Sequence, residues 1–400
     1  MSTSRNEDCI RNEGCLYVAL ELSNAKWRVA FSTGLGQKPR QRELGAGAFL
    51  GLLAEIREAK RRLGLPPDAP VRCCYEAGRD GFWLHRCLCQ KGIENIVVDS
   101  SSIEVSRRAR RPKTDRLDGE KLLNMLIRWA QGEETVWSVV NPPTVEQEDA
   151  RQAHRELEAL KHEQTRHGNR IKGLLVKMGI QLEKIDAKFP DLLQELKLWD
   201  GGRIPENLKQ CLLREFERMR LVNRQIRHLE KERAAAIRQQ QAAEEKQQPG
   251  DSQLGMVCDL LRLASIGPAS SWLFVYEVFG WRKVKTRRQL AALLGLVPSP
   301  YNSGNTQRDQ GISKSGNRRM RTMAIEIAWC WLRWQPDSSL SRWYLQRFGN
   351  GSKRQRRIGI VGLARKLMIA LLKYLREGEV PEGARWREGP LSFSYTPSLS

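Results

Sequence analysis

The sequence predicts a mixed α/β domain at its N-terminal end, two long charge-rich helices in the middle, and a mainly helical domain after them. Three successive patterns indicate this architecture: apolar strands alternating with amphipathic helices, two heptad-like apolar seams, and helical periodicity broken by glycine-rich turns. The expected domains cover residues 16–141, 142–248 and 254–376, between disordered ends at residues 1–15 and 379–400.

Composition favours a polyanionic partner. The 400 residues include 68 Lys and Arg against 46 Asp and Glu, a net charge of +22, which most simply suits nucleic acid. No apolar run approaches the roughly 20 residues that cross a bilayer, and no signal-peptide pattern opens the chain, so we expect a cytoplasmic protein without a membrane partner. The nine cysteines form no CxxC pair, which argues against zinc and against a disulfide framework.

The N-terminal elements follow one another as strands first and then as alternating strands and helices. Strands are expected at Cys15–Ser23, Lys26–Ser32, Val71–Gly78 and Asn95–Ser100, and helices at Ala48–Leu63, near Gly81–Gly92, and from Asp115 to about Gln131. This order indicates a mixed sheet flanked by helices.

Four acidic residues lie at the ends of predicted strands or at the start of a predicted helix. Glu21 and Glu76 end two of the strands, and Asp115 and Asp118 share one face at the start of the last helix. Carboxyl ends of strands meet at one edge of an α/β sheet, where sites normally form. Four carboxylates there would repel one another unless a metal neutralised them, and two Mg²⁺ ions could activate a nucleophile and stabilise a leaving oxygen. The alternative is a set of ordinary strand ends and a capped, solvated helix.

A basic run precedes the two aspartates. It is suited to a phosphate backbone, although a solvated basic loop is the alternative. Its cations are Arg107, Arg108, Arg110, Arg111 and Lys113.

The middle region carries two seams at helical spacing. They predict two long helices that pack as an antiparallel hairpin or pair with another chain, which would make this region a dimerisation element. Polar His167 on the first seam is interpreted as structural, and Arg238–Gln253 as an exposed linker. The seams consist of Leu157, Leu160, Ile171, Leu174 and Met178, and of Leu212, Phe216, Met219, Val222, Ile226 and Leu229.

The third region opens with Leu260–Gly280, which resembles a helix-hairpin-helix element. Gly267 would lie in its hairpin, with backbone N–H groups facing a DNA phosphate; a plain helical turn is the alternative.

Beyond it, a helix is expected to give way to a loop rich in Pro, Gly, Ser and Asn, and then to a basic helix from Asn317 to Trp329. Gly304, Gly311 and Gly316 would permit close backbone approach to a ligand. A serine among cationic groups could attack phosphorus, but Ser299, Ser303, Ser313 and Ser315 all compete, and a phosphate-binding loop without a nucleophile is the alternative. The cations of this segment are Arg308, Lys314, Arg318, Arg319 and Arg321.

Two halves of the chain together resemble one known group. The first half contains the motifs ALELSNAKW, YEAGRDGFWL and KTDRLDGEKL, and the second half contains LASIGPASS, LGLVPSPYNSG and GISKSGNRRMR. Together these motifs resemble those of the transposases of insertion-sequence family 110, which are DEDD-type, RNA-guided serine recombinases. The resemblance runs from about Leu16 to Arg376, and the combination of KTDRxD with SGxxxxxxGISKxGNxxxR in one chain is specific.

The resemblance implies an RNase H-like (RuvC-like) N-terminal domain, a long coiled-coil hairpin and a serine transposase domain. It assigns Glu21, Glu76, Asp115 and Asp118 as an acidic tetrad for Mg²⁺ and Ser303 as the nucleophile. One departure is that the family has Asp where this chain has Glu21, whose extra methylene moves the oxygens by roughly an ångström.

The same resemblance implies excision and insertion of a mobile element. A noncoding RNA from the element would pair with double-stranded donor and target DNA, and homodimers or homotetramers would join acids of one protomer with the serine of another. Competing hypotheses are a junction-resolving metal nuclease that uses water, for which Ser303→Ala stays active, and a basic nucleic-acid-binding protein without catalysis, for which Asp115→Asn changes little.

Overall fold

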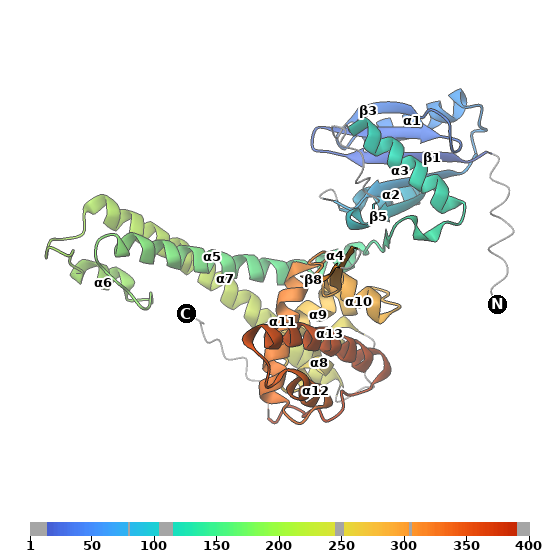
Figure 1. Cartoon of the computed structure of the whole chain (residues 1–400). Helices are drawn as coiled ribbons and strands as arrows, with labels where there is room; N and C mark the ends of the chain where they lie inside the picture. Colours follow the sequence, from blue (N-terminus) through green and yellow to red (C-terminus); the bar gives the residue numbers. More distant parts are fainter. Residues whose placement is uncertain (1–13, 79–80, 104–114, 245–251, 304–305, 390–400) are drawn as a thin grey trace. The chain divides into compact units, whose positions relative to one another are not determined.

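The computed structural model describes residues 14–78, 81–103, 115–244, 252–303 and 306–389 (Figure 1). The chain divides into two compact units, residues 1–143 and 144–400. Residues 1–13 and 390–400 of the expected disordered ends, and the basic run before Asp115, lie outside the described residues. Residues 379–389, which we also expected to be disordered, are described: Arg387 N–H donates to Arg262 O at 2.7 Å, and Trp386 pairs with Leu263.

The N-terminal unit contains a mixed sheet with strand order β3-β2-β1-β4-β5-β6. β1, β4 and β5 run parallel to one another, whereas β2, β3 and β6 pair antiparallel to their neighbours. The strands are β1 (Leu16–Leu22), β2 (Lys26–Ser32), β3 (Arg40–Gly45), β4 (Val71–Glu76), β5 (Glu94–Val98) and β6 (Val139–Val140). The helices are α1 (Phe49–Arg62), α2 (Trp83–Gln90) and α3 (Asp115–Ala130).

Helices cover both faces of this sheet. Alternate residues of β1 point to opposite faces: Val18 and Leu20 pack with α1 and α2, whereas Tyr17 and Ala19 pack with α3. The buried strands therefore read as continuous apolar runs, which is why the sequence predicted them.

The predicted strands and helices of this unit are confirmed, with two additions. No pattern in the sequence predicted β3, because RQRELG is a polar edge strand whose side chains are exposed or half-buried. β6 has only two residues and no periodicity of its own.

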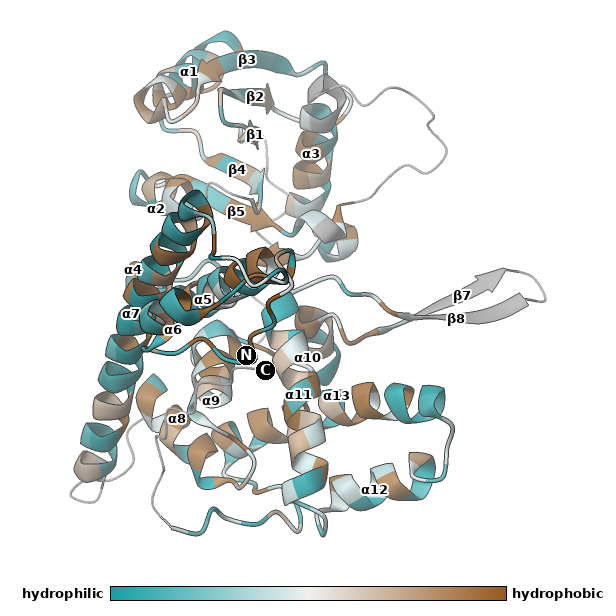
Figure 2. Ribbon diagram, turned by 90° about the vertical axis from the view of Figure 1, so that its left-hand side faces the viewer, coloured by the Kyte–Doolittle hydropathy of each residue, from teal (hydrophilic) through white to brown (hydrophobic). Residues whose placement is uncertain are grey.

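Two long helices open the second unit and pack against each other. They are α5 (Gln152–Val176) and α7 (Glu206–Glu244), with the short helices α4 (Val145–Asp149) and α6 (Phe189–Glu195) beside them in the chain. Leu157 and Leu160 pack on Ile226, whereas Ile171 packs on Leu212, so the two helices are antiparallel. Figure 2 shows the hydrophilic residues that cover much of α7.

Polar pairs separate the two apolar clusters between these helices. Gln164 Nε2 donates to Asn223 Oδ1 at 2.7 Å, and His167 Nδ1 lies 2.7 Å from Glu215 Oε2. Glu215 is buried, and it also receives a hydrogen bond from Arg218. Such polar layers fix the register of paired helices, which agrees with the structural role predicted for His167.

The boundaries of the middle region differ from the sequence prediction in two details. The apolar seam of α5 was expected to include Leu174, but Leu174 is only partly buried, and the neighbouring Leu175 is fully buried. α7 continues to Glu244, so the first part of the segment expected to be an exposed linker is helical, because RAAAIRQQQAAE is rich in helix-forming residues.

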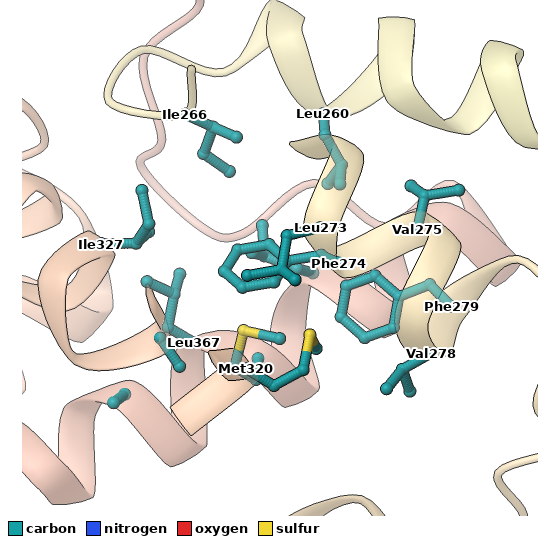
Figure 3. Packing of buried hydrophobic residues seen from close by; sticks show 14 of the residues in the cluster. Leu260, Ile266, Leu273, Phe274, Val275, Val278, Phe279, Met320, Ile327 and Leu367 are labelled. Atoms are coloured by element: carbon teal, nitrogen blue, oxygen red, sulfur yellow. The ribbon is translucent and has the colours of Figure 1, made fainter. Parts of the chain in front are cut away.

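The rest of the second unit is mostly helical around one apolar cluster. Phe274 and Phe279 face Met320, Ile327 and Leu367 in this core (Figure 3). The elements are α8 (Gln253–Arg262), α9 (Pro268–Phe274), the π-helical turn η4 (Val275–Phe279), α10 (Arg287–Leu294), β7 (Pro298–Ser303), β8 (Thr306–Ile312), α11 (Arg318–Trp334), α12 (Ser339–Phe348) and α13 (Lys353–Glu377).

The glycine-rich segment before α11 differs from the loop that we expected. β7 and β8 form an antiparallel hairpin with a register irregularity between Pro298 and Pro300. The prolines and glycines that suggested a loop are accommodated in this two-stranded ribbon because both of its strands are edges.

α12 and α13 approach closely where α13 carries glycine. A Cβ atom added at Gly359 would lie 2.5 Å from Cγ of Phe348, whereas one added at Gly362 would lie 3.4 Å from the Trp343 ring. The end of α12 therefore rests on a position of α13 that has no room for a side chain.

We predict that Gly359→Ala lowers the free energy of unfolding by about 1–3 kcal/mol, because the Phe348 ring must move. Gly362→Ala is the matched control and should be neutral or stabilising by up to about 1 kcal/mol, since alanine favours helix and meets only ordinary contacts. Urea denaturation followed by circular dichroism measures both. Equal effects of the two substitutions would contradict the close approach of Phe348 to α13.

Candidate active site

The N-terminal unit brings two of the predicted acids side by side. In the parallel pairing of β1 with β4, Leu20 is opposite Tyr75, and Glu21 and Glu76 are the next residues of the two strands. Glu21 follows Ala19 by two residues and Glu76 follows Cys74 by two, so by strand alternation both belong to the face covered by α3. The prediction that strand ends collect these acids at one sheet edge is confirmed for this pair.

A pocket of about 330 Å³ lies at this edge, and both glutamates line it. Leu122 of α3 lines the same pocket, and its carbonyl oxygen is 3.9 Å from Cys74 Sγ. The remaining lining comes from the β1–β2 turn and the residues after β4, including Ser23, Asn24 and Gly78. Glu76 is exposed and Glu21 is half-buried, so the pocket is open to an incoming ligand.

The other two predicted acids lie at the beginning of α3. Asp115 is its first residue and Asp118 follows one turn later, but their side chains lie outside the described part of the structure. The cations Arg107, Arg108, Arg110, Arg111 and Lys113 are likewise outside the described residues. Among the side chains that are described, no three His, Cys, Asp or Glu converge as metal ligands would. The tetrad itself therefore stays a prediction.

In the second unit, Ser303 is the last residue of β7. It pairs with Thr306 at the end of the β7–β8 hairpin, next to residues 304 and 305, which are outside the description. Of the competing serines, Ser299 lies nearer the start of β7, whereas Ser313 and Ser315 follow β8. The hydroxyl groups of Ser313 and Ser315 are 3.1 Å apart, so these two are engaged with each other at the opposite end of the hairpin from Ser303.

The base of this hairpin is fixed against the end of α10. Ser313 N–H donates to Val297 O at 2.9 Å, and Asn317 N–H donates to Leu293 O at 2.9 Å. Gly295 and Gly316 have φ angles of 65° and 88°, and a Cβ at either position would overlap backbone atoms of the other segment. These glycines are required by the packing of two chain segments, and not by the approach of a ligand.

The predicted phosphate-binding cations of this region differ in what they contact. Arg319 Nε lies 2.8 Å from Glu158 Oε2, and Arg321 Nη1 donates to the carbonyl groups of Leu294 and Ser315. Arg318 is exposed, and no hydrogen bond or ion pair to another described residue involves it.

Two further predicted phosphate contacts, Arg308 and Lys314, precede α11 in the chain. Lys314 is exposed and adopts a left-handed backbone conformation with φ of 56°. Arg308 lies in β8 opposite Tyr301, and its side chain is outside the description.

Gly267 precedes α9 in the short connection from α8, as the hairpin prediction required. Its N–H group donates to Ser270 Oγ at 3.1 Å, and its φ angle of −101° is accessible to any residue. The N–H group of Gly267 already has a partner, so the prediction that it faces a DNA phosphate is not supported by this geometry.

An ion pair that the sequence did not predict links α5 to η4 beside the start of α11. Glu277 Oε1 and Oε2 accept hydrogen bonds from Arg155 at 2.9 and 3.0 Å, and Asn317 Nδ2 lies 3.4 Å from Glu277 Oε2. Asn317 caps α11 by accepting from Arg319 N–H and Met320 N–H. The signal in the sequence was a single acid in the apolar run LFVYEVFG. This chain of contacts joins α5, η4 and the start of α11.

Electrostatics at this buried pair keep Glu277 ionised. Burial alone would raise the pKa of Glu277, but the Arg155 hydrogen bonds and the charges of Arg155 and Arg151 outweigh it and lower that pKa. His154 lies beside the pair with both ring nitrogens buried and without hydrogen-bond partners. Burial, and then the charge of Arg233, lower the pKa of His154 to about 4, so its ring is neutral at pH 7.

Comparison with known proteins identifies the class of this molecule. Residues 259–342 match the model of the transposase IS116/IS110/IS902 family, which covers α8 from Asp259, the β7–β8 hairpin and α11. This match indicates the transposase class for the part of the chain that holds the segment.

Relatives extend the similarity over nearly the whole chain. A putative transposase, y4rJ, of Sinorhizobium fredii is 41% identical over 93% of this chain and 94% of its own length. A second putative transposase of that organism, y4qE, is 28% identical over 65% of this chain and 58% of its own. The transposase for insertion sequence element IS1111A of Coxiella burnetii is 28% identical over 55% of each chain. The protein belongs to the IS116/IS110/IS902 family of transposases.

The structure also bears on the expected absence of a membrane partner. No described helix combines the length and the apolar character that crossing a bilayer demands.

We predict that Arg155→Leu lowers the free energy of unfolding by roughly 2–3 kcal/mol at pH 7, because it leaves the Glu277 carboxylate buried without its cation. The folded-state pKa of Glu277 is lowered, so its stabilising effect is present above the ordinary value of 4.5 and is lost as the pH falls. The difference between wild type and Arg155→Leu should therefore shrink below that pH.

Urea denaturation at pH 7 and at acidic pH measures this difference. In a Glu277→Gln background, Arg155→Leu should cost less, because no charge is left unpaired. A cost that is the same in both backgrounds would show that the ion pair does not stabilise this region.

Proposed function

We propose that this transposase cuts and rejoins DNA at an Mg²⁺-dependent acidic site, through a covalent link between Ser303 and a DNA phosphate. The observation that carries the proposal is the placement of Glu21 and Glu76. They are neighbours on parallel strands, on one sheet face, and they line one pocket.

The position of α3 supports a contribution of Asp115 and Asp118 to the same pocket. Leu122 lines the pocket, and Asp118 and Asp115 precede it by four and seven residues in the same helix. Residues four and seven positions apart share one helix face. A Cβ atom at Gly119 would lie 4.0 Å from Cβ of Ala30, so this part of α3 lies beside β2 of the sheet. This spacing supports the proposal that Asp115 and Asp118 belong to the helix face that meets the sheet edge.

The donor set suits a hard divalent cation. Glu21, Glu76, Asp115 and Asp118 offer carboxylate oxygens, which are the ligands that Mg²⁺ prefers. When bound, two such ions would neutralise the four acids and stabilise negative charge on a phosphodiester. The protein's part is to hold these carboxylates on a sheet edge and on the helix that packs over it, so that little rearrangement is needed when DNA arrives.

Ser303 would supply the nucleophile. Its hydroxyl oxygen forms a bond to phosphorus, the bond from phosphorus to a bridging deoxyribose oxygen breaks, and the serine proton ends on that leaving oxygen. Attack by a deoxyribose hydroxyl of another strand reverses the step and releases the serine. Because the phosphoester bond is exchanged and not hydrolysed, strand joining needs no external energy source.

The acids and Ser303 belong to different compact units, which suits an assembly in which separate chains complete one site. We propose that α5 and α7 take part in that assembly as a coiled-coil hairpin, in a homodimer or homotetramer. The resemblance of the sequence motifs to RNA-guided recombinases further supports an RNase H-like (RuvC-like) N-terminal fold and a noncoding guide RNA. Base pairing would then select the DNA, and the excess of cations would hold its backbone.

The test is adduct formation by the full chain with Mg²⁺, the noncoding RNA that flanks its gene, and end-labelled DNA of the element ends. Wild type should give a protein–DNA adduct on denaturing gels. Ser303→Ala should abolish the adduct, and Asp118→Asn and Glu76→Gln should each reduce it by about a hundredfold or more, as loss of a catalytic group does.

Ser313→Ala and Ser315→Ala are the matched controls, and both should retain the adduct. Cleavage without an adduct that survives Ser303→Ala would overturn the serine mechanism and favour a metal-dependent nuclease that uses water. DNA binding with no cleavage by wild type, unchanged by Asp115→Asn, would favour a non-catalytic binding protein.

A further inference from the structure

The end of α12 and the beginning of α13 form a strongly basic surface that the proposed active site does not use. Residues 338–376 contain ten Lys and Arg and no Asp or Glu. Five of these cations are exposed at the end of α12 and the beginning of α13, and we call them the α12–α13 patch. They are Arg347, Lys353, Arg354, Arg356 and Arg357.

Every residue from Ser352 to Ile358 is exposed, which is more than one full turn of α13. A helix that packs on its own protein normally buries one stripe, whereas the side chains of this turn are exposed all round the helix. The five cations of the patch form no ion pair or side-chain hydrogen bond with any described residue. Figure 2 shows these hydrophilic residues at the beginning of α13, next to the end of α12.

The support beneath the patch is rigid. Phe348 packs on Gly359, and Trp343 packs near Gly362 and lies under the Lys366 ammonium group, 4.7 Å from Nζ to the ring centroid. The Tyr344 hydroxyl donates to the Arg356 carbonyl oxygen at 3.3 Å. The cations therefore extend from a fixed helical platform, which lowers the entropy lost on binding a partner.

The chemistry of the patch fits a phosphate backbone better than a protein. The core of a protein interface is depleted of charged residues, whereas nucleic-acid interfaces are strongly positive. An α-helix is about 10–12 Å wide with its side chains, and the major groove of B-form DNA is about 12 Å wide. The major groove of double-stranded RNA is deep and narrow, so a helix with all faces exposed fits DNA.

We propose that the α12–α13 patch binds double-stranded DNA, with the exposed turn of α13 in the major groove and the neighbouring cations on phosphates. This inference rests on the proposed function only in taking DNA as the partner. α13 lies outside residues 259–342, which match the family model, and outside the elements that carry Glu21, Glu76 and Ser303. The patch would thus bind DNA through residues other than those proposed to cut it.

The experiment uses the full chain and a fluorescent DNA duplex of about 30 base pairs, roughly three helical turns. Fluorescence anisotropy gives the dissociation constant at several salt concentrations. A variant that neutralises the exposed turn of α13 should bind the duplex about tenfold more weakly or worse. Each lost phosphate contact should also reduce the slope of log K against log salt by about 0.9, and we expect two or more to be lost. The variant carries Lys353→Gln, Arg354→Gln, Arg356→Gln and Arg357→Gln.

A second variant removes the same number of exposed cations from α7 and controls for net charge. It carries Arg214→Gln, Arg220→Gln, Arg224→Gln and Lys231→Gln, and it should change the affinity less than threefold. An RNA duplex of the same length and sequence is the second probe, and the α13 variant should bind it about as well as wild type does.

Three results would overturn the inference: equal losses in the two variants, no loss in the α13 variant, or a larger loss for RNA than for DNA. Each leaves the serine mechanism untouched, since adduct formation with Ser303 is scored separately. Conversely, an α13 variant that loses duplex affinity in a chain that forms no adduct would support the patch and contradict the proposed mechanism.

Discussion

The parallel pairing of β1 with β4 is the constraint on which the candidate active site depends. Because the two strands are in register, their last buried residues are opposite each other, and the acids that follow are neighbours on the same face. α3 covers that face, and its Leu122 lines the same pocket as the two glutamates. A shift of one residue in this register would turn Glu21 or Glu76 to the face of α1 and α2, where it would be buried among apolar side chains.

In the second unit, the β7–β8 hairpin is held against the surrounding helices by specific contacts at its base. Two left-handed glycines, Gly295 and Gly316, let the segment after the hairpin pack on the end of α10. The ion pair of Arg155 and Glu277 also contacts this region, because Glu277 lies within hydrogen-bond distance of Asn317, the N-cap residue of α11. The position of Ser303 is thus linked through packed backbone and one ionic contact to α5.

Strong periodic signals made most of the fold predictable. Continuous apolar strands and the α5–α7 seams were readable from the sequence, because burial on one face or stripe leaves a regular pattern. The polar edge strand β3 and the β7–β8 hairpin left none, since their stability comes from pairing that sequence periodicity does not record. In the site, the predicted strand ends correctly indicated that Glu21 lies beside Glu76. By contrast, the N–H group of Gly267, which was expected to face a phosphate, donates to Ser270 Oγ. The Arg155–Glu277 contact joins residues far apart in the chain, so no local pattern could reveal it.

The central claim is that Glu21, Glu76 and the acids of α3 form one metal site, and metal binding tests it without any requirement for catalysis. Titration of the full chain with Mn²⁺, followed by electron paramagnetic resonance, reports bound and free ion directly. Glu76→Gln and Asp118→Asn should each weaken binding by about tenfold or more, because each removes a charged ligand, whereas Glu134→Gln on the surface should not. Unchanged Mn²⁺ affinity in both site variants would contradict the account.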